Sequence, residues 1–350
     1  NDAPEKALEY YNAACAQHNS AEALMSRAQF LADNKDYSNA LNDLVEANKI
    51  DNSEVEEESV DTSYDETIGE KSVNLLCKIA GVNDMWFNRV AKTCDNGTLS
   101  NYKNYILGKG LIDLSEKRYG EEEINTYYKA ISHLTKAIEE DKVYDGIQDL
   151  ADCYLNTGNV DDALEVLFSN YDKLKSWQRS NLFILETTQK LYDRCINDAK
   201  TLNFAGLVED EMMLKYVGHA LFLKHDYKAV VETFNEYITR LRDFNDEDFP
   251  LSSFIKDSDI DFFYYACSLI ITGKKKEGQE LMSLIYETNK EYLSTSKKCL
   301  FLHFAGRDAE ATAMLDKSIE DHNNSMKELI EDYEPRIEYN NVCLYTILGQ

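Results

Sequence analysis

The chain has 350 residues, of which 43% are hydrophobic, and it contains 3 prolines and 14 glycines. This composition favours long helices with short connections over a sheet protein. Its net charge of −27 repels the phosphates of nucleic acids and anionic lipids, so the sequence predicts neither a nucleic-acid nor a membrane partner. A Lys/Arg-containing segment of another protein would be attracted, although the charge also serves to keep an extended surface in solution.

The first predicted unit is a helical hairpin over residues 21–52. Its sequence follows a template: a small residue, a large apolar residue at +3, and then small, large and small residues at +12, +16 and +19. The residues at these positions are Ala28, Leu31, Ala40, Leu44 and Ala47. Small residues let two helices approach closely, and the large ones fill the space between them. Before this hairpin, Pro4 to Ala14 is expected to be a second helix, so the repeats of residues 1–52 start mid-repeat.

A run of acidic residues follows the first hairpin. The stretch from Ser53 to Glu70 holds eight acidic residues and no basic ones. Because it has little apolar surface to bury, we expect an exposed loop insertion over residues 53–70. Such a loop is either a solvated insertion or a docking element for a basic partner.

The remaining residues, 71–350, repeat the template of the first hairpin. It recurs as Ala151, Tyr154, Ala163 and Leu167; as Gly218, Leu221, Val230 and Phe234; as Ala266, Leu269, Gly278, Met282 and Ile285; and as Cys299, Leu302, Ala311, Leu315 and Ser318. Second helices match alone at Ala7, Tyr11 and Ala14 and at Ala130, Leu134 and Ala137. The turns between the halves carry Gly158, Gly273 and Gly306, or the pairs Asp36-Tyr37 and Asp226-Tyr227.

The template is degenerate in two stretches, residues 71–125 and 171–205. Trp86 and Trp177 fall in these stretches, and we expect both to be core residues, with a binding hot spot as the alternative. Residues 242–257 are interpreted as an insertion. Val342 to Gln350 is expected to be a first helix, so the repeats also end mid-repeat.

This pattern resembles the tetratricopeptide repeat family, whose unit is a helix–turn–helix of about 34 residues. The resemblance covers most of the chain, although the family's first-helix Trp and closing Pro are absent. It implies an all-α fold, a helical-hairpin repeat solenoid coiled into a right-handed superhelix. First helices would line a concave groove and second helices would form the outside. The implied role is to hold another protein.

The cysteines are predicted to be small, reduced core residues, because most lie on apolar stretches of predicted helices and no two have the spacing of a metal site. Reduced cysteines suggest a reducing compartment, so we expect a cytoplasmic protein. The eight positions are Cys15, Cys77, Cys94, Cys153, Cys195, Cys267, Cys299 and Cys343.

Motifs that carry chemistry are missing from the sequence. It has no H-E-x-x-H, G-x-S-x-G, dinucleotide-binding or Walker A pattern. Gly108-Lys109-Gly110 lacks the first glycine and the Ser/Thr of a phosphate-binding loop. His219 and His225 lie on different faces of a helix and make a poor metal pair. We therefore expect no enzyme, no catalytic residues, no metal and no cofactor.

Candidate partner-binding residues lie where the resemblance places the groove. They are Gln29, Gln148, Asp149, Asp152, Lys215, His219, Phe222, Phe263 and Ile270. The groove would run from polar and acidic to apolar and aromatic, which suits a peptide or helix with a basic and an apolar end. Alternatively, Phe222, Phe263 and Ile270 only pack between helices.

Some members of the family hold the acidic C-terminal tail of a chaperone with Lys, Asn and Arg on the groove-lining helices. At the groove-side positions of the five first helices that match the template, Lys215 is the only basic residue. A chaperone tail is therefore not the expected ligand.

Three functions are compatible with the sequence. The leading hypothesis is a scaffold for protein–protein interaction, which should have one long open groove. A regulatory peptide sensor should close around a central pocket. An accessory subunit of an enzyme complex, or an enzyme, should show convergent polar groups with a perturbed carboxylate.

Overall fold

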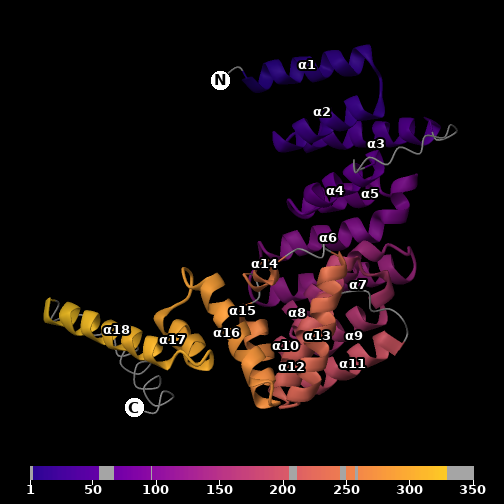
Figure 1. Ribbon diagram of the computed structural model, residues 1–350. Coiled ribbons are helices and arrows are strands. Elements are labelled where there is room, and N and C mark those ends of the chain that lie inside the picture. The colour runs from indigo at the N-terminus through magenta and orange to yellow at the C-terminus, as the bar shows by residue number, and fades with distance from the viewer. Residues whose placement is uncertain are drawn as a thin grey trace. The chain divides into compact units, whose positions relative to one another are not determined.

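The computed structural model describes residues 3–54, 67–95, 97–204, 211–244, 250–256 and 259–328, and every regular element in these ranges is helical (Figure 1). The chain divides into two compact units, residues 1–178 and 179–350. The predicted all-α class, built of helical hairpins, is confirmed for the described residues. The handedness of a superhelix depends on how the units are arranged and stays a prediction.

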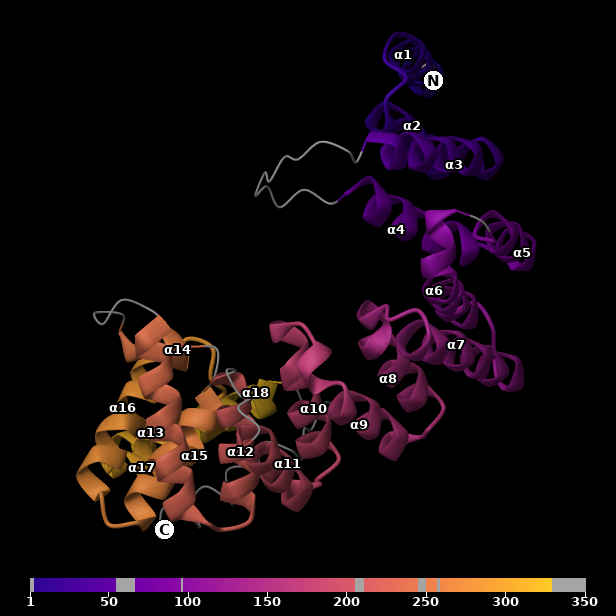
Figure 2. The ribbon, with the colours of Figure 1, turned by 90° about the vertical axis from the view of Figure 1, so that its right-hand side faces the viewer.

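The first unit is a series of hairpins in which helices pack on their neighbours in the chain (Figure 2). Its helices are α1 (Ala3–Gln17), α2 (Ala21–Asp33), α3 (Tyr37–Glu54), α4 (Ile68–Ala80), α5 (Asp84–Thr93), η1 (Thr98–Tyr102), α6 (Lys103–Ser115), α7 (Glu121–Glu139), η2 (Tyr144–Gly146), α8 (Ile147–Asn156), α9 (Val160–Ser169) and η3 (Tyr171–Lys173). Helix α2 pairs with α3, α4 with α5, α6 with α7, and α8 with α9. First helices also contact each other, α2 with α4 and α4 with α6.

The second unit follows the same plan. The boundary falls within α10 (Ser176–Thr188), and the later helices are α11 (Tyr192–Phe204), α12 (Glu211–Leu223), α13 (Tyr227–Phe244), α14 (Leu251–Ile255), α15 (Asp259–Ile271), α16 (Lys275–Asn289), α17 (Thr295–Phe304) and α18 (Asp308–Glu328). Helix α12 pairs with α13, α15 with α16, and α17 with α18. Successive hairpins contact one another through α13 and α15 and through α16 and α17.

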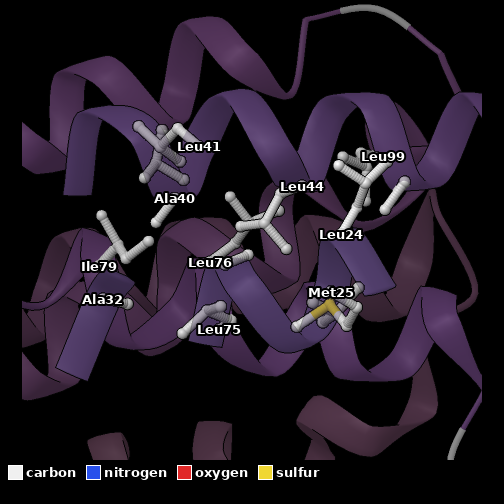
Figure 3. Packing of buried hydrophobic residues seen from close by; sticks show 14 of the residues in the cluster. Leu24, Met25, Ala32, Ala40, Leu41, Leu44, Leu75, Leu76, Ile79 and Leu99 are labelled. Carbon is white, nitrogen blue, oxygen red and sulfur yellow. The ribbon is translucent and has the colours of Figure 1, made fainter. Parts of the chain in front are cut away.

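The small residues of the template lie where paired helices touch. Ala40, Ala163 and Ala311 are completely buried, as are the first-helix positions Ala28 and Ala151. Figure 3 shows the result in the first unit, where Leu44 of α3 and Leu76 of α4 lie close together in the core. The predicted packing of small against large residues is confirmed at these positions.

One turn geometry closes most of the hairpins. A residue with positive φ follows the first helix, at Lys35, Gly158, Lys190, His225, Gly273 and Gly306. Its N–H donates to the carbonyl three residues earlier, and the next N–H donates to the carbonyl five residues before it. These two bonds satisfy carbonyls left free at a helix C-terminus, and glycine adopts the required φ without strain. The predicted turn glycines are confirmed, and Lys35 and His225 take the same conformation before the predicted Asp-Tyr pairs.

The turn at Lys190 reveals a regular hairpin in the degenerate stretch 171–205. In the template register, Phe183 of α10 occupies the small position and Glu186 occupies the large apolar position. Cys195 takes the +12 position on α11, and all three residues are completely buried. The stretch therefore folds like its neighbours, with a carboxyl group at a position that holds Leu or Tyr in the other hairpins with this turn.

Two predicted loops are shorter than expected. Within the expected acidic loop 53–70, Glu54 ends α3 and α4 begins at Ile68 behind the N-cap Thr67. Thr67 and Glu70 form a reciprocal capping box, in which each side chain accepts a hydrogen bond from the other residue's backbone N–H. Residues 55–66 lie outside the described residues. The expected insertion 242–257 includes the end of α13 and the short helix α14, and residues 245–249 also lie outside.

Seven cysteines are buried free thiols, as predicted, and Cys343 lies outside the described residues together with the expected helix 342–350. Burial raises the pKa of the Cys77, Cys94, Cys153 and Cys267 thiols to about 12, so they are neutral at physiological pH. Within the described ranges, no helix is both long and apolar enough to cross a membrane.

Enlarging a contact residue should destabilise the fold. Ala311→Leu places a larger side chain where α18 meets α17, and we expect a loss of about 1–3 kcal/mol in the free energy of unfolding, measured by chemical denaturation. Ala309→Leu is the matched control, because Ala309 is exposed on the same helix. Equal stability of the two variants would show that the register of this hairpin is wrong.

Candidate peptide-binding groove

Three adjoining hollows form a groove in the first unit, two of them beside first helices and the third beside the short connections η1 to η3. The hollow with the most aromatic lining, named here the aromatic hollow, has a volume of about 500 Å³ and is lined by Tyr102, Tyr105 and Trp177 among others. A second, the lysine hollow, has a volume of about 720 Å³ and is lined by Lys71, Lys78 and Lys109. The two share Asn74, Tyr105 and Lys109. A third, of about 450 Å³, shares Tyr102, Asp145 and Lys175 with the aromatic hollow.

The aromatic hollow is built from several helices of the first unit and their connections, among them α6 with Tyr105 and Lys109. Helix α4 contributes Asn74, η1 contributes Tyr102, and α8 contributes Asp149. Trp177 comes from the first turn of α10. Two of its aromatic side chains are open to solvent, since Tyr102 is 41% and Trp177 68% exposed. A large aromatic surface left exposed in a hollow is typical of a binding site.

Lys109 and Asp149 form the central ion pair of the groove. Lys109 Nζ donates to Asp149 Oδ1 at 2.7 Å, and these side chains are 33% and 19% exposed. Burial works against the charge on Lys109, but the attraction of Asp149 outweighs it and raises the pKa of the lysine. Lys109 therefore stays charged, and it lies where the aromatic hollow and the lysine hollow adjoin.

Gly108 and Gly110 explain how Lys109 reaches the groove. A Cβ on Gly110 would lie 2.5 Å from Cβ of Ala80 in α4, and a Cβ on Gly108 would lie 2.6 Å from Cγ of Leu134 in α7. Both glycines therefore allow α6 to approach a neighbouring helix closely. The Gly-Lys-Gly sequence serves helix packing, and Lys109 between the glycines lines the groove.

A second ion pair lies at the rim of the aromatic hollow. Lys175 Nζ is 2.8 Å from Asp145 Oδ1, and these side chains are 59% and 55% exposed. A pair this exposed contributes about 0–1 kcal/mol, because water screens it. An incoming charged group can therefore replace one partner of this ion pair at little cost in free energy.

The lysine hollow has the opposite sign of charge. Lys71 and Lys78 lie two turns apart on α4 and are exposed, and neither makes an ion pair within the described residues. Asp113 is the carboxylate among its lining residues, and burial raises the pKa of this group. The charge along the groove thus changes from positive beside α4 to more negative beside α8. The sequence template did not locate these lysines because α4 lies in a degenerate stretch.

Four predicted site residues belong to the first unit. Gln148 and Asp149 line the aromatic hollow, and Gln29 lines the lysine hollow. Asp152 is one turn from Gln148, whose Nε2 donates to Asp152 Oδ1 at 2.9 Å. Burial is the main cause of a raised pKa at Asp152. Gln29, Gln148 and Asp149 therefore line the groove, whereas Asp152 lies beside it and lines none of the three hollows. The contact of all four residues with a partner stays a prediction.

The other five belong to the second unit, where they contact neighbouring helices. Lys215 Nζ lies 3.0 Å from Asp261 Oδ2 in a mostly buried ion pair. Tyr264 is the neighbour of both His219 and Phe222, with ring centroids 4.9 Å and 4.3 Å away.

Phe263 and Ile270 also pack inside the second unit. The Phe263 ring is 5.4 Å from Phe301 and 5.7 Å from Phe304 of α17. Ile270 packs at Gly278 of α16, where an added Cβ would meet its Cγ1 at 2.6 Å. These contacts agree with the alternative in which the apolar candidates pack between helices.

The prediction that both tryptophans are core residues is wrong for Trp177. Trp86 packs against the core, with Arg89 Cζ 4.8 Å above its ring and Tyr37 5.1 Å away. Trp177 instead lies in the first turn of α10, where it is 68% exposed. The alternative of a binding hot spot therefore remains for Trp177, whereas sequence reasoning missed Tyr102 and Asp145. The three short connections η1, η2 and η3 bring these residues together, and none of them belongs to the repeat template.

Glu186 is the carboxylate whose environment is most unusual. It is completely buried, and neither of its carboxyl oxygens has a hydrogen-bond partner within the described residues. Arg194 Nε lies 3.5 Å from Glu186 Oε1 and 3.4 Å from Asp198 Oδ2. Burial, followed by the neighbouring Asp198, raises the pKa of Glu186 to about 9, so it is protonated at neutral pH.

Glu186 is buried between helices and is therefore part of the core of its hairpin. The three hollows of the groove are lined by other residues. Among the described residues, no cluster of three or more His, Cys, Asp or Glu side chains is suited to a metal ion. A perturbed carboxylate is expected at an active site, but here the repeat register accounts for it.

The pH dependence of stability tests this assignment. The pKa of Glu186 is about 9 in the folded protein and near its ordinary value of 4.5 when unfolded, so the folded state binds the extra proton between these values. Its contribution to stability is complete below pH 4.5 and falls as the pH rises towards 9. We expect Glu186→Gln to match the native protein near the acid end of this range and to exceed its melting temperature near the alkaline end. A difference in melting temperature between the two proteins that stays constant across this pH range would contradict the buried, protonated state.

Comparisons with known proteins give little further information. No protein-family model matches the chain, and no curated protein is significantly similar to it in sequence. Among solved structures, the crystal structure of yeast Tom70 is similar, with 12% identity over 91% of this chain and 81% of that chain and a TM-score of 0.24. A likeness at this level carries no function, and the architecture rests on the helix packing described above.

Proposed function

We propose that this protein is an interaction scaffold whose first unit holds a Lys/Arg-containing peptide or helix of a partner protein. The observation that supports this most is the pair of exposed aromatic residues in the aromatic hollow. Tyr102 and Trp177 offer apolar area that a partner side chain would cover. Exposed Tyr and Trp in a hollow provide much of the binding energy in protein interfaces.

The charges of the aromatic hollow support a basic residue in the partner. Its lining includes the carboxylates of Glu70, Asp145 and Asp149 and the ammonium groups of Lys109 and Lys175. Each of these lysines is already paired with a carboxylate of the hollow. The charge of the whole chain, −27, adds a long-range attraction for cations.

The lysine hollow indicates which partner residues would lie next to the basic one. A segment that places a basic residue beside α8 would continue towards Lys71 and Lys78 on α4. Acidic or neutral partner residues fit best there, because like charges in contact lower affinity. The proposed ligand is therefore a segment of mixed charge with its basic residue at the aromatic end.

Removal of the groove carboxylate Asp149 together with its neighbour Asp152 should slow the association of such a partner. In the double variant Asp149→Asn with Asp152→Asn, Lys109 loses its carboxylate partner and the local potential becomes more positive. We expect a lower association rate, a smaller change in dissociation rate, and binding that weakens as salt rises. Biolayer interferometry measures both rates for the full chain and a partner peptide.

Selection from a random peptide display library against the full chain supplies that peptide. The matched control for binding is Asp161→Asn with Asp162→Asn, which removes the same charge from exposed positions on α9 of the same hairpin. Enrichment of uniformly acidic peptides, or equal effects of the two double variants, would contradict the groove assignment. If no peptide is enriched, the scaffold proposal itself fails.

A further inference from the structure

We infer that the aromatic hollow of the first unit is a recognition site for an arginine side chain, which stacks on Trp177 and Tyr102 and pairs with Asp145. This inference rests on the proposed function and adds the identity of the recognised side chain. It is carried by the exposed aromatic pair, the exchangeable ion pair at its rim, and a matching contact elsewhere in the same unit.

The two tryptophans of the chain are in contrasting environments. Trp86 is partly buried, and the guanidinium carbon of Arg89 lies 4.8 Å from its ring centroid. Trp177 is 68% exposed and lines a hollow of about 500 Å³ together with Tyr102. The exposed surface of Trp177 leaves room for an incoming guanidinium, at a ring distance like that of Arg89 from Trp86.

A guanidinium suits this surface better than an ammonium group does. Its planar face stacks on aromatic rings, and its edge offers parallel N–H donors to one carboxylate. An ammonium group is more strongly hydrated and has no planar face. The hollow is therefore expected to select Arg over Lys, a distinction that net charge alone does not make.

Asp145 is the carboxylate most accessible to the incoming arginine. Asp149 is held by Lys109 at 2.7 Å in a partly buried pair, and Glu70 Oε2 accepts a hydrogen bond from Thr67 N at 2.8 Å as part of the capping box. Asp145 is paired with the exposed Lys175, which lines the same hollow. The arginine would displace Lys175 from Asp145, so Lys175 acts as an internal competitor for the site.

Because Lys175 competes with the ligand, the direction of the change in affinity distinguishes an arginine ligand from an acidic one. For an arginine ligand, Lys175→Gln removes the competitor and should tighten binding by about threefold. Trp177→Ala and Asp145→Asn should each weaken it by about tenfold. For an acidic ligand held by the lysine, Lys175→Gln would weaken binding and Asp145→Asn would strengthen it.

The experiment measures three capped peptides against the full chain by isothermal titration calorimetry at low salt. The peptides share one alanine-based sequence and carry Arg, Lys or Glu at the same positions. Two controls remove similar groups outside the groove. Tyr119→Ala removes an exposed aromatic ring, and Lys129→Gln removes an exposed charge on α7. Circular dichroism confirms that each variant keeps its helix content.

The expected result is that the Arg peptide binds more tightly than the Lys peptide, that the Glu peptide does not bind, and that Lys175→Gln tightens the Arg complex. Three results would overturn the arginine site: tighter binding of the Glu peptide, equal binding of Arg and Lys peptides, or no effect of Trp177→Ala. If the peptide enriched by display binds the groove but the Arg peptide does not, the arginine site fails while the scaffold stands. If neither binds, both proposals fail.

Discussion

The close approach of two helices at small residues is the contact on which the whole structure depends. At Ala28 and Ala40, at Ala151 and Ala163, and at Cys299 and Ala311, the side chains are small enough for paired helices to touch, and all are completely buried. No single hairpin covers its own apolar stripe, so neighbouring hairpins must pack on it. In the first unit α2 thereby contacts α4 and α4 contacts α6, and the groove lies beside these helices.

The turns allow this repeat to tolerate unusual residues. Two backbone hydrogen bonds close the first helix whether the positive-φ residue is Gly158, Lys35 or Lys190. With the turn fixed, the position of Glu186 is fixed too, and its carboxyl group is carried into the core. Protonation removes the cost of a buried charge there, at the expense of stability that declines as pH rises.

The fold could be predicted from the sequence wherever the residues keep the spacing of the template. Where small and large residues kept their spacing, as at Ala266 and Leu269, the hairpins and their buried faces were predicted correctly. Where Phe183 and Glu186 replaced them, the periodic signal was lost although the backbone kept its register. A residue pattern reports side-chain size and polarity, whereas the turn geometry that preserves the register is made by the backbone.

The groove was less predictable than the fold for a related reason. Gln148 and Asp149 were placed on the groove because they belong to a regular first helix. Tyr102, Asp145 and Trp177 lie on or beside short connections, which no periodicity describes. Gly108-Lys109-Gly110 lacks the residues of a phosphate-binding loop, and the close helix contacts of the two glycines explain how Lys109 comes to line the groove. The chemistry of this site therefore depends on residues outside the repeat.

The central claim is that the first unit binds its partner along α4, α6 and α8 and at the start of α10. Hydrogen–deuterium exchange of the full chain, with and without a peptide enriched by display, tests it most directly. The account predicts slower exchange in segments covering these helices, with α5, α7 and α9 unchanged. Protection confined to α5, α7 and α9, or to the second unit, would contradict it.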